Sequence, residues 1–471
     1  MKRFFVVVIC AISLGAAQTN SGRLPDAEEA ALARINPDAL HADLAYLASD
    51  DLAGRNTPSP GLDLAAEYIA AHFRQGGLEP AGPDGSYFQV AKFERLTPSP
   101  EGFRLELKAG NKKVSIAADR LRMRAETAID YQDAPVLRLA ASGNVFPISG
   151  RIVVGDEQHY GSQALIDELQ SHKPALIVLV GRTRSFQGSS PYLGEADGAR
   201  APVLQVRDSE AAALLREDGG FSLSLHAAAP TREEFPLRNV AAILRGSDPV
   251  LQDQYVVLTA HYDHVGQNST GIFHGANDNA SGTASVIEIA NALAALNPHP
   301  KRSILFMTFF GEEKGLLGSY YYTHHPLVPL KNTVANVNLE QMGRTDDLTG
   351  RKVGTFVFTG PSYSDLPAIM SRVAKLEGVT TEKRPDLDDY FNRSDNYAFA
   401  KEGVVAHTIA VAVDFPGYHG LGDTVDKIDY DNMARVDKGV AAGIVELADE
   451  AAAPKWSDSK AAAVYRSAAG N

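Results

Sequence analysis

The second half of the chain alternates between buried-strand and helix patterns, and this alternation restricts the fold more than any other feature. Apolar runs typical of buried strands cover residues 255–260, 303–310, 334–339 and 404–411, and helical patterns cover 283–296 and the segment from 315. Strands that alternate with helices favour parallel pairing, because parallel neighbours need a long crossover connection. We therefore expect an α/β fold with a mostly parallel, mixed sheet that is flanked by helices.

The first half of the chain predicts a different organisation. Asn36-Pro37-Asp38 is typical of a helix start, and alternating apolar residues between about 85 and 125 predict strands. Residues 18–129 are expected to form the N-terminal part of one domain, which residues 233–453 complete. Residues 130–232, with strand-like runs of their own, are expected to form a separate β-rich insert. The Ala/Ser-rich segment 454–471 lacks apolar periodicity and predicts a frayed tail.

Composition excludes several classes of protein. Of 471 residues, 44% are hydrophobic and 22% are charged, which is ordinary for a globular chain and excludes wholly disordered or collagen-like ones. Lys and Arg total 45 against 58 Asp and Glu, so the net charge is 45 − 58 = −13. Such a surface repels phosphate backbones and anionic lipid heads, and we expect no nucleic-acid partner.

The N-terminus has the pattern of a signal peptide. Lys2 and Arg3 precede an apolar run from Phe4 to Ile12, and small residues at Gly15 and Ala17 suit cleavage, so residues 1–17 predict export to the periplasm or the medium. The run is too short to span a membrane, and no later run is long enough. The single cysteine, Cys10, excludes an internal disulfide, so any metal must bind histidines and carboxylates.

Five short polar motifs follow predicted strands or precede predicted helices. Ligands of open α/β sheets bind at the carboxyl ends of the strands, so these motifs point to one site. Each motif alone has an ordinary explanation, such as helix capping, compensation of the helix dipole or a solvated loop. They are His261-Tyr262-Asp263, Asn277-Asp278-Asn279-Ala280-Ser281-Gly282, Gly311-Glu312-Glu313, Glu340 and Tyr418-His419-Gly420.

Together the motifs supply two histidines and three carboxylates. The set is His261, Asp278, Glu313, Glu340 and His419. If Asp278 is shared, each of two metal ions receives three protein ligands, which matches a dizinc site with water at the open positions. Nitrogen and oxygen ligands suit zinc, and other divalent transition metals also fit. Asp263 can hold the second ring nitrogen of His261, and Glu312 can take a proton from a metal-bound water.

The stretches HYDHVG, GANDNASG, FFGEEKGLLGS, NLEQMGR and GYHGLGDT resemble, in this order, the M28 family of zinc metallopeptidases. The stretch LAYLASDDLAGR is similar to bacterial secreted members. The resemblance covers most of residues 36 to 450. It implies the zinc exopeptidase fold for the sheet and, from the strand pattern around Gly150-Arg151-Ile152-Val153-Val154, a protease-associated (PA) domain for the insert.

The resemblance also implies a role for each site residue. His261 and Glu340 would bind one zinc and Glu313 and His419 the other, with Asp278 as the bridge. Glu312 would be the general base, Asp263 would orient His261, and Tyr418 would donate to the oxyanion. Three positions depart from the family pattern: Glu340 stands where many members have Asp, Asn396 stands where relatives have His, and Gly420-Leu421-Gly422 replaces a Thr-Pro pair.

The expected function is that of an exported dizinc exopeptidase. It would remove N-terminal residues from peptides, by metal-bound hydroxide with Glu312 as base. The alternatives are a carboxypeptidase of the same family, a glutaminyl cyclase-like enzyme and a non-catalytic receptor-like relative. The full set of ligands argues against the last two. The sequence leaves open the preferred terminal residue and the oligomeric state.

Overall fold

A computed structural model describes residues 23–99, 101–139, 147–161, 163–181, 192–195, 200–217, 219–382 and 384–470. The predicted signal peptide, residues 1–17, lies outside the described residues. The chain folds into two compact units. The first unit contains the residues up to Phe88 and those from Val240, and the second unit runs from Gln89 to Asn239. The chain passes between them along β2 (Phe88–Thr97) and β12 (Thr231–Leu244).

The first unit is built on a mixed sheet with the strand order β19-β18-β20-β17-β13-β16-β12. Its central pairs β20–β17, β17–β13 and β13–β16 are parallel, and β12 and β18 add antiparallel neighbours. The strands are β12, β13 (Tyr255–His261), β16 (Ser303–Phe309), β17 (Thr333–Glu340), β18 (Thr355–Phe358), β19 (Thr380–Glu382) and β20 (Ala406–Ala410). Short strands are β1 (Glu79–Pro80), paired with β12, and the hairpin of β14 (Gln267–Asn268) and β15 (Gly271–Ile272). This confirms the expected α/β class.

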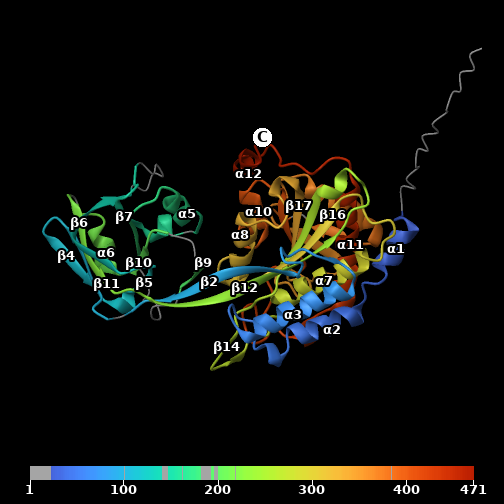
Figure 1. The fold of residues 1–471 in the computed structure, drawn as a ribbon, viewed down its shortest axis with the longest axis horizontal. Coiled ribbons are helices and arrows are strands. Elements are labelled where there is room, and N and C mark those ends of the chain that lie inside the picture. The colour runs from blue at the N-terminus through green and yellow to red at the C-terminus, as the bar shows by residue number, and fades with distance from the viewer. Residues whose placement is uncertain are drawn as a thin grey trace, which may run out of the picture. The chain divides into compact units, whose positions relative to one another are not determined.

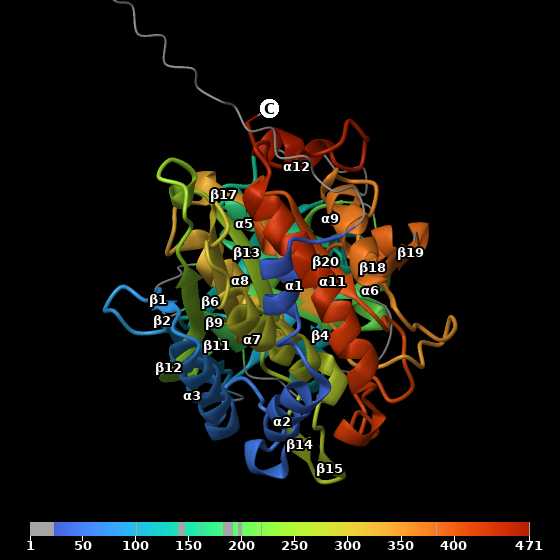
Figure 2. The same ribbon diagram turned by 90° about the vertical axis from the view of Figure 1, so that its right-hand side faces the viewer.

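Helices cover both faces of this sheet. On one face α7 and α11 pack on β13, and α2 and α3 lie against α7 (Figures 1 and 2). On the other face α8 packs on β16, and α10 packs on β17 and β20. The helices are α1 (Asp26–Leu32), α2 (Pro37–Leu47), α3 (Pro60–Gln75), α7 (Gly282–Leu293), α8 (Leu317–His324), α9 (Leu366–Ala374), α10 (Asn396–Lys401), α11 (Tyr430–Asp449) and α12 (Ala463–Ala468). In the described part of the chain, none of the helices has the length and apolarity needed to cross a bilayer.

Local signals explain where these elements begin. The Asn36 side chain accepts hydrogen bonds from the backbone N–H groups of Asp38 and Ala39, so it caps α2 at the predicted position. Every residue of β13 and β16 is buried, as expected for central strands covered on both faces. The six strand and helix segments expected after residue 255 are all present, with ends that shift by at most a few residues.

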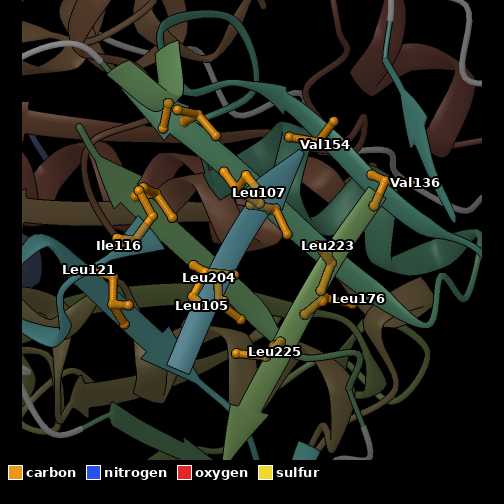
Figure 3. Packing of buried hydrophobic residues seen from close by; sticks show 14 of the residues in the cluster. Leu105, Leu107, Ile116, Leu121, Val136, Val154, Leu176, Leu204, Leu223 and Leu225 are labelled. Atoms are coloured by element: carbon orange, nitrogen blue, oxygen red, sulfur yellow. The ribbon is translucent and has the colours of Figure 1, made fainter. Parts of the chain in front are cut away.

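The second unit is a sheet of eight strands in the order β4-β3-β11-β6-β7-β8-β10-β5. Residues of β8 alternate between two cores: Leu176, Val178 and Val180 face one, and Ile177 and Leu179 the other. Figure 3 shows leucines of β3 and β11 in the first of these cores. The strands are β3 (Arg104–Ala109), β4 (Lys112–Ile116), β5 (Leu121–Arg124), β6 (Ile129–Arg138), β7 (Ile152–Asp156), β8 (Leu176–Gly181), β10 (Val203–Arg207) and β11 (Phe221–Ala227). The unit also has β9 (Tyr192–Glu195) and the helices α4 (Glu157–Tyr160), α5 (Gln163–Ser171) and α6 (Ser209–Leu214).

The second unit begins earlier than the sequence suggests. We expected residues 18–129 in the first unit and the insert at 130–232, but the boundaries fall at Gln89 and Asn239. The reason is strand pairing between distant segments: β3 pairs with β11 and β5 with β10, so both join the second sheet. Alternation along residues 85–125 predicts the strands but does not identify their partners. The PA-like nature of this unit stays a prediction.

The C-terminal segment is not the frayed tail that we expected at 454–471. Trp456 is only 8% exposed, forms a bridge with Ser364 and donates its Nε1–H to the carbonyl of Gly403 at 2.9 Å. The Tyr465 ring, on α12, lies 5.2 Å from both Trp456 and Phe391. Aromatic anchors spaced nine residues apart produce no helical or strand period, so the sequence pattern missed them.

Trp456→Ala tests this anchoring. The loss of a buried indole and its hydrogen bond is expected to lower the free energy of unfolding by about 3 kcal/mol. Val464→Ala is the control, because Val464 is 65% exposed and on the same segment, and its truncation should change stability by less than about 0.5 kcal/mol. Urea unfolding followed by circular dichroism measures both. Equal, small effects would mean that the segment is frayed after all.

Candidate metal centre

Parallel pairing brings four of the predicted site residues to one edge of the first sheet. His261 ends β13, Glu340 ends β17, and Glu312 and Glu313 follow β16. In register, His261 pairs with Phe309 on β16, and Glu340 pairs with Ala410 on β20. All three strands therefore deliver their side chains at the same carboxyl edge, as an open α/β sheet requires.

Asp278 reaches the same edge from the turn that precedes α7. The carboxylate of Asp423 accepts hydrogen bonds from the backbone N–H groups of Asn277 (2.9 Å) and Asp278 (3.0 Å), which fixes the turn. Gly275, just before the turn, has φ +59°, and a Cβ there would lie 2.4 Å from the His264 ring. Only glycine allows this approach. His419 comes from the loop after β20.

The first group of side chains surrounds the His261 ring. Its Nε2 lies 3.3 Å from Glu340 Oε1, 3.5 Å from Asp278 Oδ1 and 4.0 Å from Glu312 Oε2. Ser394 donates to Glu340 Oε1 at 2.5 Å and holds that carboxylate in place. The ring is almost fully buried, so these carboxylates set its environment.

The second group surrounds His419. Its Nε2 lies 3.0 Å from Asp278 Oδ2 and 3.1 Å from Glu313 Oε1, and the latter oxygen is also 3.0 Å from His264 Nδ1. The two oxygens of Asp278 thus face the two histidines His261 and His419 separately. Among the described residues, Asp278 Oδ2 has no hydrogen-bond donor in good geometry, although His419 Nε2 lies 3.0 Å away.

The spacing of these atoms fits metal ions. Two ligands of a tetrahedral zinc ion, each about 2.1 Å from it, lie about 3.4 Å apart. The ring nitrogens of His261 and His419 lie 3.0–3.5 Å from the oxygens of Asp278, Glu313 and Glu340. Glu312, at 4.0 Å from His261, is more distant than a second ligand of the same ion should be. The donor set, two imidazoles and three carboxylates, is one that zinc accepts.

Burial and mutual contact perturb the acidities of the group. Burial raises the pKa of the Glu312 carboxyl well above its ordinary value, against the attraction of His261 and with the repulsion of Glu340 and Glu313. Contacts with the carboxylates of Asp278 and Glu313 raise the pKa of His419 to about 10. Burial opposes ionisation of Asp278, but the contacts with His261 and His419 prevail and lower its pKa. Without a metal, the histidines are thus the cations that balance these acids.

Asp263 supports the centre through both of its carboxylate oxygens. Oδ1 accepts the backbone N–H of Glu312 at 3.1 Å, and Oδ2 accepts the Thr57 hydroxyl at 2.9 Å. The Nδ1 of His261 faces the backbone carbonyl of Asp263 at 3.1 Å, and Oδ1 lies at 3.5 Å. Residue 263 therefore contacts both His261 and the backbone of Glu312.

Arg55 braces the same region from the N-terminal segment. It is fully buried, and it donates to the carbonyl oxygens of Tyr262 (2.9 Å), His274 (2.8 Å) and Gly275 (3.0 Å) as well as that of Leu47. Burial lowers the pKa of Arg55 to about 10, so the guanidinium stays charged at neutral pH. Its contacts fix the segments on either side of the metal centre.

All the predicted ligand positions converge, and the structure adds residues that the sequence reasoning missed. His264, Asp423, Thr57 and Arg55 are buried around the centre without having been selected. His264 and Asp423 stand inside the stretches HYDHVG and GYHGLGDT, so the motifs contained the signal. Arg55 ends the stretch LAYLASDDLAGR, so this motif also contained it, whereas Thr57 stands in a polar loop with no distinguishing pattern.

The centre opens to a cavity of about 140 Å³. Tyr418 lies on its wall, half exposed, with its ring stacked on His419 at a centroid distance of 4.0 Å. The cavity is smaller than the pockets of about 300–1,000 Å³ that hold whole small molecules. It suits a single side chain or a chain terminus. The lining residues are His261, Asp278, Glu312, Glu340, Gln341, Thr359, Tyr390, Arg393, Ser394, Thr408, Ala410, Val413, Asp414 and Tyr418.

Comparison with known proteins points to the family that the sequence motifs resemble. Residues 239–444 match the model of Peptidase family M28. The "Probable leucine aminopeptidase" of Arthroderma otae is 30% identical over 213 residues, which are 44% of this chain and 57% of the relative, so the match spans little more than half of that protein. The "Probable lipoprotein aminopeptidase LpqL" of Mycobacterium tuberculosis is 24% identical over 469 residues, 91% of this chain and 89% of the relative.

A solved structure shows the same fold. The aminopeptidase from Aneurinibacillus sp. strain AM-1 matches with a TM-score of 0.55 and 18% identity, over 90% of this chain and 97% of that one. The α/β sheet of the first unit thus has a group of histidines and carboxylates at its carboxyl edge that could hold metal ions. The segment that matches peptidase family M28, residues 239–444, contains every residue of the two groups described above.

Arg55→Met tests whether the hydrogen bonds from Arg55 to buried carbonyl oxygens stabilise the first unit. The variant leaves several buried carbonyl oxygens without donors, so the free energy of unfolding of the first unit should fall by about 3–5 kcal/mol. Urea unfolding can be followed by the fluorescence of Trp456, the single tryptophan of the chain. Arg351→Met is the control, since that side chain is 75% exposed. A similar urea midpoint of unfolding for both variants would contradict a stabilising role of Arg55.

Proposed function

We propose that the protein is an exported dizinc aminopeptidase that removes N-terminal residues from peptides. The observation that carries the proposal is the placement of two histidines and three carboxylates at ligand spacing, with Glu312 beside them but outside that spacing. The names of the relatives support the reaction, and the pattern of residues 1–17 supports export.

The chain's own residues would hold the metal in two sets. His261 and Glu340 would bind one zinc ion, Glu313 and His419 the other, and Asp278 would bind both through its separate oxygens. Bound zinc supplies Lewis acidity, which polarises a peptide carbonyl and makes water more acidic. His264, in contact with Glu313, would orient that ligand.

Glu312 would move the proton. Its raised pKa means that the carboxylate attracts a proton near neutral pH more strongly than an exposed glutamate does. Oε2, the oxygen nearest His261, would take a proton from the attacking water and return it to the leaving amine. The hydrogen bond from the Glu312 N–H to Asp263 keeps the backbone of the base fixed during both transfers.

The small cavity supports removal of single residues. A space of about 140 Å³ next to the metal groups admits one terminal residue, and the remaining peptide would extend outward. Tyr418, on the wall beside His419, would place its hydroxyl near the carbonyl oxygen that gains charge. We also propose that the second unit is PA-like.

Mass spectrometry of a mixed peptide pool tests the reaction. The pool includes N-acetylated and C-amidated members and is incubated with chelator-treated protein and again after zinc is restored. Zinc-dependent loss of single N-terminal residues, blocked by acetylation, is the expected result. Loss from the C-terminus, blocked by amidation, would make the protein a carboxypeptidase, and absence of trimming would contradict an exopeptidase.

Glu312→Gln separates the base from the ligands. Removal of a general base is expected to lower kcat by about 10²–10⁴-fold, while the bound zinc changes little because the ligand set is intact. Elemental analysis measures zinc, and a fluorogenic amino-acid amide measures turnover. Glu377→Gln, on the same unit and away from the centre, serves as the matched control. Activity like that of the wild type would refute the assignment of the base.

Zinc binding should release protons. With a pKa of about 10, His419 is protonated at neutral pH in the metal-free protein, and Nε2 must lose that proton before it can bind zinc. The apparent zinc affinity should therefore rise as the pH increases from about 7 towards 10. Calorimetry in buffers of different ionisation enthalpy counts the protons. His419→Gln should release about one proton fewer than the exposed control His324→Gln, and equal counts would contradict this.

A further inference from the structure

The cavity at the metal centre contains a cation that the proposed chemistry does not use. Among the described residues that line it, Arg393 is the only lysine or arginine. The other charged groups on its wall are the carboxylates of Asp278, Glu312, Glu340 and Asp414, together with His261. The first three carboxylates belong to the metal centre, so Arg393 and Asp414 remain as charges that face the substrate space.

Arg393 is held by an aromatic ring rather than by an acid. Its guanidinium lies over the ring of Tyr390, 4.2 Å from the centroid, and the side chain is exposed. Among the described residues, no carboxylate forms an ion pair with Arg393, whose guanidinium contacts the Tyr390 ring instead. A stacked guanidinium uses its face for the contact with the ring and keeps its in-plane N–H donors for a ligand.

The backbone ties Arg393 to the metal centre. The next residue, Ser394, is buried and donates to Glu340 Oε1 at 2.5 Å, and Asn338 on β17 donates to the Ser394 hydroxyl at 2.8 Å. The N–H of Arg393 also donates to the carbonyl of Tyr390 at 3.1 Å. The backbone of Arg393 is therefore held next to a residue that contacts a predicted zinc ligand, and the Tyr390 ring holds the guanidinium. A fork of planar donors in this place suits a carboxylate.

We propose that Arg393 is a specificity-determining residue that binds a carboxylate of the peptide substrate. The inference rests on the proposed function. The carboxylate can belong to an acidic N-terminal side chain or to the C-terminus of a dipeptide, and both offer the same two oxygens. Asp414 on the same wall limits the positive field to the neighbourhood of Arg393, so one carboxylate is recognised and a general preference for acidic peptides is not expected.

Two pairs of matched peptides test the inference. One pair is Glu-Ala-Ala-amide with Gln-Ala-Ala-amide, and the other is the dipeptide Ala-Ala with Ala-Ala-amide. The readout is the ratio of kcat/KM within each pair, for the wild type, Arg393→Gln and Arg393→Lys. A hydrogen-bonded charge pair predicts that the ratio for at least one pair falls roughly 10- to 100-fold in Arg393→Gln. Lysine keeps the charge but lacks the planar fork of donors. The kcat/KM ratio of Arg393→Lys should therefore lie between that of the wild type and that of Arg393→Gln.

The ratios distinguish recognition of a carboxylate from a structural role of Arg393. A loss of packing on Tyr390 would lower kcat/KM for both peptides of a pair and leave their ratio unchanged. Arg351→Gln is the matched control and should keep every ratio of the wild type. A lower ratio for the first pair in Arg393→Gln would show that Arg393 binds an acidic N-terminal side chain. A lower ratio for the second pair would show that it binds the C-terminal carboxylate of a dipeptide. Ratios that stay unchanged in Arg393→Gln, while peptides are still hydrolysed, overturn this inference and leave the proposed function intact. A wild type that hydrolyses none of the four peptides overturns both.

Discussion

The structure depends on the compensation of acidic groups that are buried together. Asp278, Glu312, Glu313 and Glu340 meet at the carboxyl edge of a sheet whose central strands β13 and β16 are fully buried. Carboxylates in such a place repel one another and lose hydration, which costs several kcal/mol for each uncompensated charge. His261 and His419 supply the opposite charge in the described structure, and two zinc ions would supply more of it. The surrounding fold must therefore hold the acids at the distance that suits a cation, and its hydrogen bonds do so.

These hydrogen bonds explain why the ligand loops have so many polar residues. Asp423 holds the backbone of Asp278, Asp263 holds that of Glu312, and Ser394 holds the carboxylate of Glu340. Each contact removes freedom from a ligand or from the base without binding metal itself. Precise spacing is valuable in such a centre, since ligands must stay within a few tenths of an ångström of their place to select a metal.

The sequence predicted the first unit well because its signals are local. Buried apolar runs, an Asn cap and glycine-rich ends identify β13, β16, β17 and α2 within a few residues. The convergence of the proposed ligand positions was predictable for the same reason, since they lie at or after strand ends or directly before a helix. The boundary of the second unit was not predictable, because it depends on which strand pairs with which, as for β3 with β11 and β5 with β10. Arg55 and Thr57 were also missed, since neither the end of the stretch LAYLASDDLAGR nor the polar loop after it shows that these side chains will be buried.

Arg55 and Thr57 show that residues outside the segment matched by the family model also support the metal centre. The family match covers residues 239–444, yet Arg55 and Thr57 lie far before it and hold Tyr262, Asp263, His274 and Gly275. The matched segment alone would leave one oxygen of Asp263 and the buried carbonyls without these donors, at a cost of about 1–3 kcal/mol for each unsatisfied group. The loop before α3 therefore supports the metal centre in physical terms, although it contributes no ligand. The second unit, Gln89–Asn239, is connected to the first through the neighbouring strands β2 and β12. The segment before the insert therefore stays in contact with the segment after it and still completes the site.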